Sequence, residues 1–448
     1  MKITLPKIVL YICCVFTLFG TAQNNIDNLI SSQDWQNLFP KRAGTTANHP
    51  QGYTTDFFSY QNFIQAVNEM SDYLVEIRIK PGVWGELITI TKKSTSSSYV
   101  YKDVESWWHS NPTPEVVIDV DFADFANYSS ETNNKRELAA FLANISKETT
   151  GGWQLPVGGG TAGDYADWGL YFVHEVGYTS ANSAGAYSQA STEYPPNPNV
   201  GYYGRGPIQL SWNYNYGQFS KFLYNDINIL LNNPDLIQQD GVLAFKSAIW
   251  FWMMPQCPKP SCHQIMQDLW YANSGDYSQN KMYKKGFAHT NNIINGGLEC
   301  RTNSSPAFTE KVVLRSELYK YYLDIMGFTS TEIALEDTGS YSTLCYESNT
   351  DAMEDYTKCY SDTILSNPDT SLDTFELYPN PVTEKLTIDT KQQPVNSIEL
   401  FNLQGQLLVS INPQSFVTTL DMSNLKAGIY ILSIKNLNSI TSYKIIKK

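Results

Sequence analysis

Glu148 stands near the end of a predicted helix, beside the apolar face that this helix would bury. From residue 137 to 149 the apolar positions have the i, i+3, i+4, i+7 spacing of a core-facing stripe: Leu138, Phe141, Leu142 and Ile145. Glu148 should lie beside that stripe, whereas Lys147 should point away. Burial disfavours the ionised form of a carboxyl group, so Glu148 could hold a proton and act as a general acid. A solvated glutamate at a helix end is the alternative that this segment alone leaves open.

The composition of the chain points away from nucleic acids, anionic membranes and metal sites. The chain has a net charge of −13, whereas nucleic acids and anionic lipids attract clusters of lysine and arginine. The histidines are scattered and the cysteines lack paired zinc-ligand spacing, so we expect neither a metal nor a cofactor. An aromatic share of 13% favours a carbohydrate ligand, because flat rings match the apolar face of a sugar.

Residues 1–22 have the pattern of a secretory signal peptide. Lysines at positions 2 and 7 precede an apolar run that is too short to span a bilayer, and Gly-Thr-Ala precedes Gln23. Two of the seven cysteines lie in this peptide, so the mature chain keeps Cys257, Cys262, Cys300, Cys345 and Cys359. This odd number allows two disulfides and one leftover thiol.

The remaining chain divides by composition into a body over residues 23–345, a polar linker over 346–374 and a last segment over 375–448. In the body, residues 240–254 are apolar all round and predict a buried helix, in which Trp250, Phe251 and Trp252 serve packing. Residues 291–297 have a loop signature, and the glycine-rich stretch 158–163 predicts a flexible connector. The last segment alternates apolar and polar residues between turn signals and predicts a small β-sandwich with strands over 385–389, 397–401, 406–411, 417–420 and 428–435.

The last segment resembles the C-terminal sorting domain of proteins that the type IX secretion system of Bacteroidetes exports. Its Tyr-Pro-Asn-Pro start at Tyr378, its Gly-Ile-Tyr strand at Gly428 and its final lysine pair carry the resemblance. The resemblance implies the type IX machinery as a partner and a secreted or cell-surface location. A carbohydrate-binding module is the alternative, but no tryptophan follows Trp270 to form a sugar platform.

Five ordered motifs of the body resemble the plant-type chitinases of glycoside hydrolase family 19. They lie over residues 135–153, 168–175, 202–217, 243–253 and 292–300. The resemblance implies a mainly α, lysozyme-like bilobal fold with a long cleft, and hydrolysis with anomeric inversion. It makes chitin, or a related N-acetylglucosamine polymer, the expected partner of a chain that we expect to be monomeric.

The resemblance assigns roles to residues position by position. Glu148 matches the general acid, Glu175 the general base and Ser211 the hydroxyl that positions water. Four further residues match groups that contact the sugar, and two match charged groups that hold the base in place: Gln209, Tyr214, Asn215 and Asn295, then Glu299 and Arg315. An arginine beside Glu175 would keep that carboxylate ionised. Singly, Asn215 and Asn295 also fit loop capping.

The resemblance also implies a disulfide between Cys300 and Cys345, and we expect Cys257 and Cys262 to close the short loop between them. Two positions depart from the family, which commonly has histidine where this chain has Lys147 and Trp212. The lysine would add a positive charge near the acid if its ammonium lay close, and the tryptophan would add a stacking surface. Residues 67–133 form an insertion without an assigned role.

Three functions compete at this point. The first is a secreted endo-acting chitinase that cuts β-1,4 linkages. The second is a peptidoglycan hydrolase, because bacterial and phage relatives with the same lobes cleave cell-wall glycan, although an acidic chain suits an anionic wall poorly. The third is a non-catalytic chitin-binding protein, which the presence of both glutamates disfavours.

Overall fold

The computed structural model describes residues 26–80, 83–151, 162–256, 260–269, 286–299, 306–336, 375–390, 395–402, 406–413, 415–435 and 440–448. The chain divides into two compact units, residues 1–362 and residues 363–448. Several predicted features lie outside the described residues: the signal peptide, the linker, residues 158–161 of the glycine-rich stretch 158–163, and Cys257, Cys300, Cys345 and Cys359. The last two residues of that stretch, 162–163, begin a helix. Cys262 is buried, and its pairing stays a prediction. None of the described helices combines the length and hydropathy of a membrane span.

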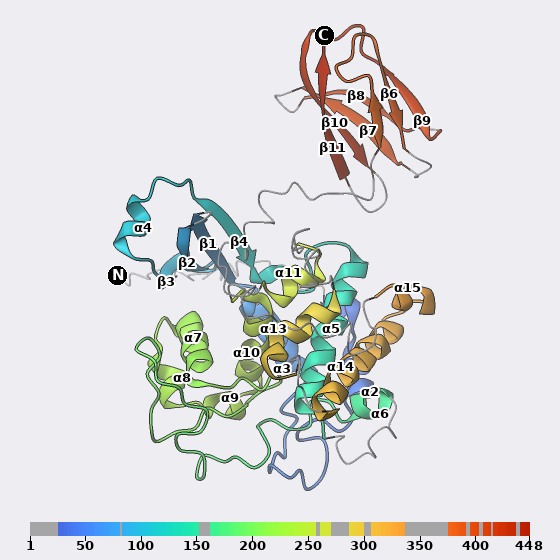
Figure 1. The fold of residues 1–448 in the computed structure, drawn as a ribbon. Helices are drawn as coiled ribbons and strands as arrows, with labels where there is room; N and C mark the ends of the chain where they lie inside the picture. Colours follow the sequence, from blue (N-terminus) through green and yellow to red (C-terminus); the bar gives the residue numbers. More distant parts are fainter. Residues whose placement is uncertain are drawn as a thin grey trace, which may run out of the picture. The chain divides into compact units, whose positions relative to one another are not determined.

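Helices form most elements of the first unit (Figure 1). The longest are α5 and α14, and α5 lies against α14, α13 and α11. The helices are α1 (Ile26–Leu29), α2 (Ser32–Leu38), α3 (Tyr60–Met70), α4 (Ser106–Ser110), α5 (Glu131–Thr149), α6 (Ala162–Asp167), α7 (Asn213–Tyr224), α8 (Asn228–Asn232), α9 (Leu236–Gln239), α10 (Gly241–Met253), α11 (Cys262–Met266), α13 (Phe287–Glu299), α14 (Pro306–Ile325) and α15 (Ser330–Leu335), with a 3-10 turn η1 at Phe122–Asp124.

A four-stranded antiparallel sheet lies in the predicted insertion. Its strands are β1 (Tyr73–Lys80), β2 (Val83–Lys92), β3 (Ser97–Lys102) and β4 (Val116–Asp121), in the order β3-β2-β1-β4. Alternate residues of β1 are buried, so one face of the sheet joins the core of the unit. Tyr73 packs on Phe222 of α7 with ring centroids 4.9 Å apart, and the hydroxyl of Tyr99 donates to the carbonyl of Phe222. These two contacts attach the sheet to helix α7.

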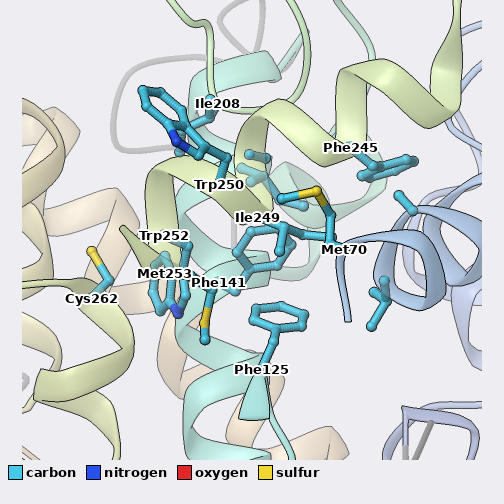
Figure 2. Packing of buried hydrophobic residues seen from close by; sticks show 14 of the residues in the cluster. Met70, Phe125, Phe141, Ile208, Phe245, Ile249, Trp250, Trp252, Met253 and Cys262 are labelled. Carbon is cyan, nitrogen blue, oxygen red and sulfur yellow. The ribbon is translucent and has the colours of Figure 1, made fainter. Parts of the chain in front are cut away.

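The predicted buried helix is α10, which begins at the N-cap Asp240. Trp250 and Trp252 have no exposed surface, which confirms that these indoles serve packing (Figure 2). Trp252 packs edge-on against Phe141 of α5 at 5.5 Å between ring centroids, so α10 and α5 share one core. Phe251 differs from the prediction, because it lines a cavity and is only partly buried.

The segment predicted as a loop over 291–297 is helical. It belongs to α13, which is kinked at Asn295, where φ is −145° and ψ is 21°. Asparagine and glycine in sequence indicated a loop, but burial of this segment in the core favours hydrogen-bonded backbone. The irregular backbone that the sequence indicated is thus confined to one residue of the helix, Asn295.

The second unit contains two antiparallel sheets. One has the order β11-β10-β7-β8 and the other β5-β6-β9, and side chains from both meet in one hydrophobic cluster that includes Leu386, Leu400 and Leu432. The strands are β5 (Glu376–Tyr378), β6 (Lys385–Asp389), β7 (Ser397–Phe401), β8 (Leu407–Ile411), β9 (Val417–Asp421), β10 (Gly428–Lys435) and β11 (Ile440–Lys447). The five predicted strands are confirmed to within one residue at each end. A unit in which helices form most of the described elements is thus followed by a unit whose described elements are strands.

Candidate active site

Both predicted catalytic carboxylates and all four predicted sugar contacts line one cavity of about 490 Å³. Glu148 and Glu175 both line it. So do the other predicted residues apart from two: Gln209, Ser211, Tyr214, Asn215 and Asn295 line the cavity, whereas Glu299 and Arg315 do not. The remaining lining groups come from Tyr187, Gly204, Ile208, Leu210, Trp212, Phe251, Gln256, Ile293, Ile294 and Gly296.

The segments that carry the two glutamates are joined directly by backbone hydrogen bonds. Helix α5 ends one residue after Glu148, and there the amide of Phe172 donates to the carbonyl of Thr149 at 2.9 Å. The amide of Gly151 donates to the carbonyl of Trp168 at 3.1 Å. A Cβ at Gly151 would lie 2.4 Å from Cδ1 of Tyr171, so this close approach requires glycine. These bonds hold the turn that leads to Glu175 against the end of α5.

Glu175 is held by two neutral donors from the loops around it. The hydroxyl of Tyr187 donates to Oε1 of Glu175 at 2.7 Å, and the amide of Gly204 donates to Oε2 at 3.2 Å. The amide of Glu175 in turn donates to the carbonyl of Gly204 at 2.8 Å. Burial and the bond to Glu175 raise the pKa of Tyr187, so this phenol remains a donor. Donors on both oxygens stabilise the ionised form of the carboxylate, which is the form that can accept a proton from water.

Arg205 organises the loop behind Glu175. Its guanidinium is buried, stacks over the Tyr203 ring at 3.5 Å, and donates to Asp235 at 2.6 Å. The backbone of Arg205 pairs with Leu210 and with His174, the residue before Glu175. Arg205 therefore links the loop that carries Gln209 and Ser211 to the segment that leads to Glu175.

The hydroxyl and amide groups of this loop are oriented by the loop itself. Ser211 Oγ donates to the carbonyl of Gln209 at 2.9 Å, which leaves the oxygen lone pairs to accept from a water or a sugar hydroxyl. Asn215 Nδ2 donates to the carbonyl of Ser211 at 2.9 Å. Gln209, Trp212 and Tyr187 have φ of 52°, 74° and 55°. Non-glycine residues in this left-handed region cost about 1–3 kcal/mol each and gather at functional sites.

Aromatic rings form one wall of the cavity. Trp212 is 39% exposed and lies nearly parallel to Tyr214, with ring centroids 6.2 Å apart and planes at 15°. Tyr187 meets Trp212 edge-on at 5.3 Å. Trp212 is therefore a partly exposed lining residue, and its role as a stacking surface for sugar stays a prediction.

Arg315 pairs with Glu148 and Glu299, so its predicted place beside Glu175 is wrong. Its Nη2 donates to Oε1 of Glu148, its Nε donates to Oε2 of Glu299 at 3.1 Å, and its Nη1 donates to Oδ1 of Asn144 at 2.8 Å. The physical reason is that α14 packs along α5, on which Glu148 lies, whereas Glu175 lies on a loop. The two charged residues therefore hold the predicted acid.

Lys147 joins the same cluster instead of pointing away, which corrects a second prediction. Its Nζ donates to Oε1 of Glu299 at 2.8 Å and lies 3.7 Å from Oε1 of Glu148. Helix α5 is buried on almost every side from residue 137 to 147, so no face of the helix was left for solvent. Burial and the Arg315 charge lower the pKa of Lys147, against the pull of the two glutamates. Burial raises the pKa of Glu299, but the charges of Arg315 and Lys147 outweigh it and hold that pKa well below its ordinary value.

The charge cluster also reaches a predicted sugar contact. Asn295 Nδ2 donates to Oε1 of Glu299 at 3.0 Å, the oxygen that Lys147 also contacts. The kink of α13 at Asn295 thus places an amide between the cavity and the buried charges.

Sequence reasoning missed Tyr187, Phe251 and Gln256 as lining residues. Tyr187 stands alone among Ser, Ala and Gly in a loop without periodicity, so the sequence holds no signal for its contact with Glu175. Within the described ranges, no group of three or more His, Cys, Asp or Glu side chains could hold a metal ion. The cavity chemistry rests on carboxylates, amides, a hydroxyl and aromatic rings.

Comparisons with known proteins identify two families that match different parts of the chain. Residues 115–337 match the family described as Chitinase class I, and residues 376–448 match the family described as Secretion system C-terminal sorting domain. Endochitinase A2 of Pisum sativum is 44% identical over 206 residues, which cover 46% of this chain and 57% of the relative. The Basic 30 kDa endochitinase of Solanum lycopersicum is 44% identical over 211 residues, covering 47% of this chain and 60% of that protein.

The chain thus spans less than two thirds of the length of these relatives. Among solved structures, chitinase C from Streptomyces griseus HUT6037 superposes loosely, with a TM-score of 0.39 and 25% identity over 67% of this chain and 78% of that one. The two family matches lie in different units of the chain. The first unit thus contains a region similar to class I chitinases, and the second unit contains a region similar to secretion-system C-terminal sorting domains.

Proposed function

We propose that the protein is a secreted, endo-acting chitinase that hydrolyses β-1,4 linkages between N-acetylglucosamine units with inversion. The observation that carries the proposal is that Glu148 and Glu175 line one cavity, inside a region similar to class I chitinases. Relatives that are 44% identical over this region are named endochitinases. All four residues that we expect to contact sugar line the same cavity.

Inversion needs two carboxyl groups with different tasks. Glu148 would protonate the glycosidic oxygen as it leaves, and Glu175 would remove a proton from a water on the opposite face of the sugar. The Tyr187 hydroxyl and the Gly204 amide donate to Glu175 and would stabilise its ionised form, which can accept that proton. Ser211 and Glu175 directly follow Leu210 and His174, which both pair with Arg205. The Oγ of Ser211 would accept the second hydrogen of the water.

The other lining groups suit an acetamido sugar. The amides of Gln209, Asn215 and Asn295 can bond the N-acetyl group and ring hydroxyls, and the exposed face of Trp212 can stack on a pyranose ring. Neutral hydrogen-bonding groups and one aromatic face match an uncharged polysaccharide.

The proposal is tested by Glu148→Gln and Glu175→Gln on chitin oligosaccharides. Glu148→Gln should abolish hydrolysis and leave oligosaccharide binding largely intact, because the amide keeps the shape without a proton to donate. Glu175→Gln should also be severe. Early products of the unaltered protein, read by NMR, should be α anomers, and β anomers would contradict inversion.

Release of sugar from colloidal chitin should exceed clearing of purified peptidoglycan. The reverse result would make the protein a peptidoglycan hydrolase. Binding of chitin without cleavage of either polymer would make it a chitin-binding protein.

We further propose that residues 376–448 direct export by the type IX secretion machinery. The match to a secretion-system sorting domain supports this, and the predicted peptide over 1–22 would supply passage across the inner membrane. A chain that ends at Glu347 keeps every proposed site residue, so it should retain hydrolysis and stay in the periplasm of the native host. Normal export of this shorter chain would contradict the sorting role, and lost binding to crystalline chitin with normal export would favour a carbohydrate-binding role.

A further inference from the structure

We propose that Lys147 sets the upper pH limit of hydrolysis by opposing the protonated form of Glu148. The inference rests on the proposed function, because it takes Glu148 as the general acid. It goes beyond that function by assigning a positioning residue that touches neither the sugar nor the water.

Lys147 belongs to a buried group of four charged side chains. The Lys147 side chain is 9% exposed, and its ammonium faces Glu148 on α5, Glu299 on α13 and Arg315 on α14. Glu299 and Arg315 have no exposed side-chain surface, and Glu148 is 15% exposed. Water therefore has little access to this group, and charges at these distances act on one another without much screening.

The charges balance only when Glu148 is ionised. Two cations, Lys147 and Arg315, then face two carboxylates, Glu148 and Glu299. When Glu148 carries the proton that it must donate, the same two cations face Glu299 alone, and the buried group has an excess positive charge. An excess charge in a buried group is unfavourable, so Lys147 works against the acid-ready form.

The geometry separates this effect from simple packing. Lys147 Nζ is 2.8 Å from Glu299 and 3.7 Å from Glu148, so its charge acts on the acid directly. Without this cation, Arg315 alone would face two carboxylates, and protonation of Glu148 would then restore the balance. A neutral residue at position 147 should therefore favour the acid-ready form over a wider pH range.

The experiment compares activity–pH profiles of the full chain and three variants on a chitin oligosaccharide. In Lys147→Gln the basic limb of the kcat profile, where the general acid loses its proton, should move to higher pH by roughly one to three units. Lys147→Arg keeps a cation and serves as the matched control, whose basic limb should stay in place. Thermal unfolding of each variant would confirm that it is folded before the profiles are compared.

Glu299→Gln removes a negative charge from the group, whereas Lys147→Gln removes a positive one. It keeps the test decisive if the Lys147→Arg control does not fold. Removal of one carboxylate leaves two cations facing Glu148, so the basic limb should move to lower pH. The double variant Lys147→Gln/Glu299→Gln leaves Arg315 facing Glu148, and its limb should return toward that of the unaltered protein. A purely structural role of Lys147 would lower activity equally at all pH values and would show no such opposite shifts.

Failure of this inference is distinguishable from failure of the proposed function. Titration of the Glu148 carboxyl by carbon-13 NMR reports the same shifts without any turnover. An unmoved titration in folded Lys147→Gln overturns the inference even if chitin is cleaved. A moved titration in a chain that cleaves no chitin supports the charge argument and overturns the proposed function.

Discussion

Tyr187→Phe removes a single hydroxyl from the candidate base and leaves the ring in place. The hydroxyl donates to Oε1 of Glu175 at 2.7 Å, whereas the ring packs edge-on against Trp212 at 5.3 Å. After the change, the Glu175 carboxylate keeps the hydrogen bond from the Gly204 amide at 3.2 Å. The substitution therefore tests one hydrogen bond to the group that we propose activates water.

The expected fall in kcat/KM follows from the negative charge of the carboxylate that accepts the hydrogen bond. A hydrogen bond to a charged group contributes about 1.5–3 kcal/mol, and each 1.36 kcal/mol of transition-state stabilisation changes a rate tenfold, so kcat/KM should fall by roughly 10- to 150-fold. Most of the loss should appear in kcat, because the hydroxyl holds the base and not the sugar. The acid limb of the profile should move to higher pH, because the lost bond stabilises the carboxylate form of Glu175.

The matched control is Tyr178→Phe. Tyr178 packs edge-on against Tyr187 at 5.7 Å, so it shares the same aromatic cluster. Its backbone amide, which the substitution leaves unchanged, donates to the carbonyl of Glu175 at 3.4 Å. Steady-state kinetics from pH 4 to 9 on a chitin oligosaccharide would compare the two variants. An unchanged kcat/KM and an unmoved acid limb in folded Tyr187→Phe would refute the role of this hydroxyl.

Three further predictions concern the scaffold that positions the site. Phe141→Ala empties a fully buried position and should lower the free energy of unfolding by about 3–5 kcal/mol in urea titrations; a loss under 1 kcal/mol would contradict its place in the core. Gly151→Ala puts a Cβ 2.4 Å from the Tyr171 ring, so it should lower both stability, by about 1–3 kcal/mol, and kcat, and a variant with normal kcat would show that the turn can adjust. Burial lowers the pKa of His49 and of His174, so between these lowered values and the ordinary value of 6.5 the unfolded chain binds more protons than the folded chain. Stability should therefore be fully present above about pH 6.5 and fall as the pH drops below it; the melting temperature should show this slope, and replacing both histidines by asparagine should flatten it.

Much of the fold follows from local patterns in the sequence. The stripe from Leu138 to Ile145 predicted α5, and the apolar run from residue 240 to 254 predicted α10, because helical periodicity and burial are properties of neighbouring residues. The alternating segments after residue 375 predicted five strands of the second unit for the same reason. The buried segment over 291–297 was misassigned as a loop, because tertiary burial overrides the local preference of asparagine and glycine.

The partners of the charged groups were decided by the tertiary structure alone. The sequence by itself determined that two glutamates, a serine and several amides belong to one ordered set of motifs, because residue types and their order are local information. It could not determine which glutamate the arginine contacts, since Arg315 and Glu148 lie 167 residues apart and meet only because α14 packs along α5. Lys147 turned inward for the same reason, because the packing of α5 left no solvent-facing side. Tyr187 reaches Glu175 from an aperiodic loop, and the direction of such a side chain is set by contacts across the fold.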